Sequence, residues 1–110
     1  MSNSQSSNSE LLKSLLAPLL DDFQYWFGRS RALLETETIT FLGPDAQADL
    51  LARVLTAQQE VSTTQLLFNT TGGQVGVEPA VLVPWHALVQ ECWRVAMRFR
   101  QESAEKGMQG

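Results

Sequence analysis

Few residues of this sequence have the chemistry of a catalytic site. The chain has one histidine, His86, and one cysteine, Cys92, which lie six residues apart. On a helix this spacing separates two side chains by about 240° round the axis, so they would not share a face. His86 could act as a general base or an axial ligand, but no Ser, Cys or Asp lies at a spacing that completes a relay. We therefore expect that the chain is not an enzyme. We expect His86 to lie in the first turn of the third helix, where it caps the helix or packs on the glycine-rich loop.

Metal and redox chemistry have equally little support. A structural zinc site takes several Cys and His ligands, and one cysteine cannot form an intramolecular disulfide. Cys92 lies at helical spacing between Leu88 and Val95, which predicts a small, buried and unreactive side chain. Asp21 and Asp22 are neighbours that point about 100° apart on a helix, so they do not converge on one substrate atom. The sequence thus predicts no metal and no cofactor.

Two other features could bind a ligand. Arg94, Arg98 and Arg100 place three positive charges within seven residues, with no acid between them. This edge could meet an acidic partner, a phosphate or an anionic lipid, or it could simply complement the helix dipole, with Arg98 paired to Glu102. The segment 72–76 has three glycines but lacks the strand and helix that frame a phosphate loop, so it is interpreted as a helix stop and a turn.

The composition limits the remaining classes of function. The chain has 110 residues, 44% of them hydrophobic, and a formal net charge of −4. Its length suits one domain, and its acidity argues against general nucleic-acid binding, which needs a basic face. The apolar run over 80–89 is about half the length of a membrane span, so we expect no transmembrane segment and at most weak peripheral membrane contact. The low cysteine content and the absence of a signal-peptide pattern predict a cytoplasmic location.

The first helix is the clearest element of the chain. Ser7 and Glu10 have the spacing of a capping box, and large apolar residues then recur every seven positions as far as residue 37. Three neighbouring seams of this kind make the broad stripe of a bundle helix. One seam contains Leu12, Leu19, Trp26 and Leu33, and another contains Leu20, Phe27 and Leu34. Pro18 predicts a kink or a fresh helix start.

Two further helices complete the predicted fold. Pro44 suits the first position of a helix over 44–68, although the polar run 62–64 leaves its continuity open. After a short turn over 80–83, Pro84 starts a helix that ends near residue 103. Because short connections make neighbouring helices antiparallel, the sequence predicts an all-α, up-down-up bundle of three helices over residues 9–104. Residues 1–8 are expected to form a disordered N-terminal tail, and residues 105–110 a frayed C-terminus.

The aromatic side chains exceed what one small core needs. Tyr25 falls on the polar side of the first stripe, and Trp93 falls at the edge of the third, so some of these rings should be exposed. An exposed apolar patch usually marks a partner surface. The sequence therefore favours a non-enzymatic interaction module that binds a protein partner or itself through Tyr25, Trp26, Trp93 and the arginine edge. The alternative is a carrier of a small molecule, a pigment or lipid, with Trp85 as an aromatic wall and His86 as a polar contact.

Three segments of the chain also resemble a known family. They are residues 21–27 (DDFQYWF), residues 68–69 with 73–77, and residues 84–86 with 91–97. Together they are similar to small cyanobacterial proteins classed as a domain of unknown function, over roughly residues 11–101. The resemblance implies a cyanobacterial, helical and cytoplasmic protein, and it supplies no catalytic residue.

Overall fold

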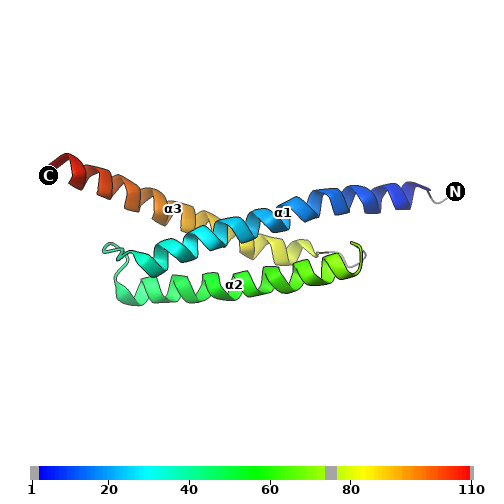
Figure 1. Cartoon of the computed structure of the whole chain (residues 1–110), viewed down its shortest axis with the longest axis horizontal. Coiled ribbons are helices and arrows are strands. Elements are labelled where there is room, and N and C mark those ends of the chain that lie inside the picture. Colours follow the sequence, from blue (N-terminus) through cyan, green and yellow to red (C-terminus); the bar gives the residue numbers. More distant parts are fainter. Residues whose placement is uncertain (1–2, 74–76, 110) are drawn as a thin grey trace.

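The chain folds into three helices connected by short segments. A computed structural model describes residues 3–73 and 77–109, with side chains described for 10–73 and 77–107. The helices are α1 (Asn3–Thr36), α2 (Pro44–Thr70) and α3 (Pro79–Gln109), and no strand occurs among the described residues. Helices α1 and α3 run in the same direction and α2 runs against them (Figure 1). The predicted all-α, up-down-up bundle is therefore confirmed.

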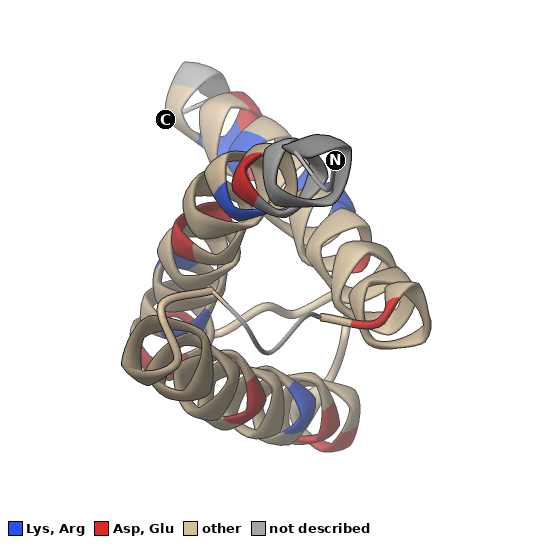
Figure 2. Ribbon diagram, turned by 90° about the vertical axis from the view of Figure 1, so that its right-hand side faces the viewer, with Lys and Arg blue, Asp and Glu red and all other residues tan. Residues whose placement is uncertain are grey.

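The bundle is a rod rather than a sphere. It measures 68 × 25 × 19 Å, because the first turns of α1 project beyond one end and the last turns of α3 beyond the other (Figure 1). Helix α1 packs closely along α2 and crosses α3, whereas the backbones of α2 and α3 approach each other less. Viewed from the end where α1 projects, the helices lie like the sides of a triangle (Figure 2). None of the helices, over the described residues, is both long and apolar enough to cross a membrane.

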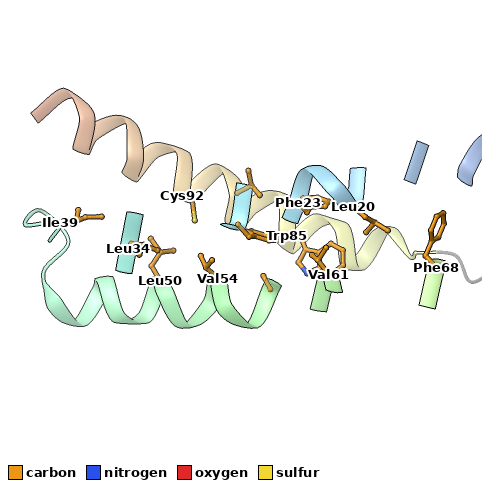
Figure 3. Close-up of a cluster of buried hydrophobic side chains, with 13 residues drawn as sticks. Leu20, Phe23, Leu34, Ile39, Leu50, Val54, Val61, Phe68, Trp85 and Cys92 are labelled. Atoms are coloured by element: carbon orange, nitrogen blue, oxygen red, sulfur yellow. The ribbon is translucent and has the colours of Figure 1, made fainter. Parts of the chain in front are cut away.

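The core is apolar, and all three helices contribute to it; from α1 it takes mainly one of the predicted seams. Leu20, Phe27 and Leu34 are at most 5% exposed, and the sticks of Figure 3 show the core side chains between the helices. The buried set is Leu20, Phe23, Phe27, Leu34, Ile39, Leu50, Val54, Ala57, Val61, Phe68, Trp85, Val89 and Cys92. In contrast, Leu12 is 57% exposed and Leu19 is 36% exposed. The seam that contains them was predicted to face the bundle along its whole length, which is wrong because α1 extends past the start of α3 (Figure 1).

The helix boundaries differ from the predicted ones at both ends of the chain. Helix α1 begins at Asn3, before the predicted cap, and continues through Pro18 without a fresh start. The side chain of Pro18 is exposed, so the carbonyl that loses its N–H partner can meet water. The predicted disorder of residues 1–8 and fraying of residues 105–110 stay predictions. Met1, Ser2 and Gly110 lie outside the described residues.

Helix α3 begins five residues earlier than predicted. It includes Pro84 in its second turn, and its first residue is Pro79. Proline at position 84 removes only the hydrogen bond to the carbonyl of Ala80, and Ala80 is exposed. Pro79 is thus the proline that occupies the favoured first helical position.

Helix α2 is continuous through the polar run 62–64, and two side chains of α1 explain this polarity. The Nε2 of Gln24 donates to the Oγ of Ser62 at 2.7 Å, and Asp21 accepts from the Nε2 of Gln65 at 2.9 Å. Thr64 satisfies its own hydroxyl by donating to the carbonyl of Glu60. The polar residues therefore line the edge of the α1–α2 contact and do not interrupt the helix.

The connection between α1 and α2 is fastened by one glutamine. The Oε1 of Gln47 accepts from the backbone N–H of Ile39 at 2.9 Å, and its Nε2 donates to the carbonyls of Leu34 and Glu37 at 2.9 and 2.7 Å. Ile39 itself is 1% exposed and belongs to the core. Gly43 then turns the chain into α2 with a φ of 82°, which favours glycine. We call this set of three hydrogen bonds the Gln47 clamp.

Candidate functional site

A groove between α1 and α3 collects several of the predicted partner-binding residues. It has a volume of about 240 Å³ and is lined by Trp26, Arg29, Ser30, Leu33, Cys92, Trp93, Ala96, Phe99 and Arg100. We call it the tryptophan groove. The groove lies where α1 and α3 cross (Figure 1). Residues 26–33 of α1 line one side of it, and residues 92–100 of α3 line the other.

Three aromatic rings form a continuous row at this groove. The rings of Tyr25 and Trp26 meet edge to face with centroids 5.0 Å apart, and those of Trp26 and Trp93 do so at 5.2 Å. Such pairs add about 0.5–1.5 kcal/mol beyond the burial of their area. Tyr25 is nevertheless 53% exposed and Trp93 42% exposed. The structure therefore brings together the three predicted aromatics, and the row leaves apolar surface in contact with water.

The floor of the groove is unreactive. Cys92 is a buried free cysteine, as predicted. Burial raises the pKa of its thiol, against the opposing effect of a hydrogen bond with Ser30. Since the thiolate is the nucleophilic form, this cysteine is held in its protonated state at neutral pH. The Oγ of Ser30 also donates to the carbonyl of Trp26 at 2.8 Å, so both polar groups of the floor are occupied.

Two arginines, one from each helix, line the groove beside the aromatic row. The Nη1 of Arg29 donates to the hydroxyl of Tyr25 at 2.9 Å, and its guanidinium lies 5.8 Å from the centre of the same ring. Arg100 lines the groove from α3 and is exposed. The sequence analysis did not include Arg29 in the site. Its position four residues after Tyr25 on a helix does indicate that the two side chains can be in contact. The groove therefore combines an apolar floor with a positive rim.

The predicted arginine edge is divided between two sides of α3. Only Arg100 lines the tryptophan groove. Arg98 stacks on the ring of Phe41, 4.2 Å from its centre, and pairs with Glu102 at 3.7 Å, as its spacing predicted. Arg94 is exposed and is not part of the groove lining. The three arginines thus do not form a single charged surface.

The residues of the alternative carrier site are also separated. Trp85 is 2% exposed, packs its ring against Phe23 with centroids 5.5 Å apart, and donates from Nε1 to the Oε1 of Glu60 at 3.0 Å. Its edge lines a groove of about 500 Å³ between α2 and α3. His86, the next residue, is exposed and does not line this groove. The aromatic wall and the polar contact therefore do not meet.

An ion pair that sequence reasoning missed closes the α2–α3 groove at one end. Arg53 donates to both carboxylate oxygens of Glu91, at 3.0 and 2.7 Å, and to Asp49 at 3.0 Å. The hydrogen bonds from Arg53 lower the pKa of Glu91, against the effect of burial, and those to Glu91 and Asp49 raise the pKa of Arg53. The spacing of Glu91 and Arg94 would allow a pair along α3, but Glu91 bonds to Arg53 of another helix, which offers it two parallel hydrogen bonds.

The comparison with known proteins identifies the family. No curated protein and no solved structure matches the chain. A family model described as protein of unknown function, DUF2605, matches residues 6–101. This range contains α2, most of α1 and α3, and the tryptophan groove, and it includes the segments that carry the resemblance. The chain belongs to the DUF2605 family of proteins of unknown function.

Proposed function

We propose that this chain is a non-enzymatic binding module whose tryptophan groove takes an acidic segment of a partner protein with one apolar anchor residue. The proposal rests on one observation: the exposed Trp93, which meets Trp26 edge to face, lines the same groove as Arg29 of α1 and Arg100 of α3. We also propose that the protein is cytoplasmic and of cyanobacterial origin, as expected from the sequence.

The chemistry of the groove matches that of energetically important interface residues. Tryptophan, tyrosine and arginine are the residue types that contribute most to binding when they lie in a desolvated pocket. An arginine can hold a carboxylate through two parallel hydrogen bonds, so an acidic residue on each side of the anchor would meet Arg29 and Arg100. Attraction between these charges would also speed association at low salt.

The size of the groove favours a peptide anchor over a small-molecule cargo. Pockets that enclose drug-sized ligands have volumes of about 300–1,000 Å³, whereas this groove has about 240 Å³. That volume suits one apolar side chain. The groove at Trp85 is large enough for a small molecule, at about 500 Å³, but the carrier alternative finds less support there because the indole N–H of Trp85 is already bonded to Glu60 and His86 does not line that groove.

A display selection tests the proposal directly. The probe is a library of short peptides in which one leucine or aromatic residue is flanked by aspartate and glutamate, and the control library has lysine in the flanks. We expect binders from the acidic library only, with affinity that falls as salt rises. Selected peptides are then titrated against the protein while tryptophan fluorescence is recorded.

Three variants locate the binding site. Trp93→Ala and Arg100→Glu should each weaken binding about tenfold or more, which corresponds to a loss of about 1.4 kcal/mol. Arg94→Glu is the matched control, because Arg94 is an exposed arginine of the same helix that does not line the groove. Equal weakening by Arg94→Glu and Arg100→Glu would mean that the peptides follow net charge, and selection of lysine-flanked peptides would also overturn the proposal.

A further inference from the structure

Exposed apolar side chains also gather at one end of the rod, away from the tryptophan groove. Among the described side chains, eight of the eleven large exposed hydrophobic residues lie in the N-terminal part of α1, the last turns of α2 and the first turns of α3. Figure 1 shows that these three segments lie toward the end of the rod where α1 projects. We call them the apolar end: Leu11, Leu12, Leu15, Leu19, Leu66, Leu67, Val81 and Val83.

The apolar end is almost free of charge. Residues 61–73 and 79–90 contain no Asp, Glu, Lys or Arg, and residues 11–20 contain only Lys13. In Figure 2, which faces this end, the last turns of α2 are uncoloured for the same reason. Lys13 is half-buried and its aliphatic stem lies against Gly73, where an added Cβ would come within 2.8 Å of it. The apolar end is therefore poor in charge: it contains Lys13, and Glu10 and Glu78 lie at its borders.

The α1 side of this end continues a helix contact that already exists. Leu12 and Leu19 belong to the same seven-residue seam as Trp26 and Leu33. Trp26 and Leu33 pack against the core, and Trp26 meets Trp93 of α3. Beyond the start of α3 the seam has no helix across it, and Leu12 and Leu15 are 57% and 59% exposed. A helix from another molecule could pack on this N-terminal half of α1, in the way that α3 packs on the C-terminal half.

We infer that the occupant of this seam is a second copy of the chain, which docks through the apolar end in a two-fold symmetric dimer. A two-fold interface must be complementary to itself. Two copies that each carry a net charge of −4 repel one another, and the repulsion is least where the surface has no charged groups. The tryptophan groove fails this condition, because self-contact there would oppose Arg29 and Arg100 with their own copies.

The exposed leucines of α1 supply part of the area that a dimer of standard size needs. The four side chains present on the order of 400 Å² of apolar surface, about half of the ~800 Å² that each partner buries in a standard interface. The dimer must therefore also bury Leu66, Leu67 and the two exposed valines of α3. Depletion of charged residues at the centre is the usual composition of such an interface.

Sedimentation or light scattering over about 1–200 μM protein tests the inference. We expect a dimer for the native sequence, and we expect Leu15→Glu and Leu12→Glu each to weaken dimerisation at least tenfold. Both positions are outside the core, so helix content should not change, and the unfolding midpoint should fall only by the stabilisation that dimer formation adds at the protein concentration used. Met97→Glu is the matched control, since Met97 is 58% exposed but lies in α3 away from the apolar end, and this variant should remain a dimer.

Several results would overturn the inference. A monomer at every concentration would do so, as would equal effects of Leu15→Glu and Met97→Glu. A monomer that binds vesicles of neutral phosphatidylcholine, and loses that binding in Leu15→Glu, would assign the apolar end to a lipid surface instead. The test is independent of the peptide selection, because Leu15 and the tryptophan groove lie in different parts of the rod.

Discussion

The Gln47 clamp offers the sharpest test of how the fold is stabilised. In Gln47→Ala the backbone N–H of Ile39 and the carbonyls of Leu34 and Glu37 all lose their side-chain partner. A net hydrogen bond contributes about 1 kcal/mol to stability, which gives an upper value of ~3 kcal/mol for three. Water can replace the partner of Glu37, which is exposed, so we expect the free energy of unfolding to fall by about 2 kcal/mol.

Urea denaturation followed by circular dichroism measures this loss. Gln59→Ala is the control, because Gln59 is an exposed glutamine of the same helix. Gln47→Glu sharpens the test, since a carboxylate can accept from Ile39 but cannot donate to the two carbonyls. It should therefore be at least as unstable as Gln47→Ala at neutral pH. If Gln47→Ala and Gln59→Ala unfold within about 0.5 kcal/mol of each other, the clamp does not stabilise the connection in the way proposed.

Three further predictions follow from the core and the ion pairs. Phe27→Ala, at a side chain with 0% exposure, should lower the free energy of unfolding by about 3–5 kcal/mol in the same denaturation assay, and a loss below ~1 kcal/mol would contradict the assigned core. Because Arg53 lowers the pKa of Glu91 in the folded chain, this pair stabilises the fold above the ordinary glutamate pKa, and the effect is lost as pH falls through the lowered value. Glu91→Gln should thus be less stable than the native sequence at pH 7 by under about 1 kcal/mol, with the difference gone in acid; a difference that persists there would point to packing. Cys92 should react slowly with iodoacetamide at pH 8 and rapidly in urea, as mass spectrometry would show, since burial raises its pKa; equal rates in both would mean that its burial is not maintained.

The sequence predicts helices well because apolar spacing is a local property. The seven-residue steps predicted a broad apolar stripe on α1 that includes Leu20, Phe27 and Leu34, and these three residues are buried. The same spacing could not show that Leu12 and Leu19 are exposed, because this depends on where α3 begins relative to α1. Proline at position 79 and proline at position 84 are both compatible with a first turn, and only packing distinguishes them.

The candidate site was only partly predictable. Exposed aromatics were expected from their number, and Tyr25, Trp26 and Trp93 do meet. Which arginines accompany them depends on the crossing of α1 with α3, so Arg29 was missed and Arg98 was assigned to the wrong surface. The ion pair of Arg53 with Glu91 and the hydrogen bonds of Gln47 join residues that are far apart in the sequence. A periodic pattern of apolar residues does not predict such contacts.

The short, clamped connection between α1 and α2 has a consequence for the order of folding. A loop of about ten residues closes in roughly 10–100 ns, and here only residues 37–43 separate the two helices. The connection between α2 and α3 is about as short, but α1 packs along α2 much more closely than α3 does. The α1–α2 hairpin should therefore form early, and α3 should dock onto it as a later event. Trp85 is buried only when α3 docks, so its fluorescence would report the last step of folding, while the helix signal would already be largely in place.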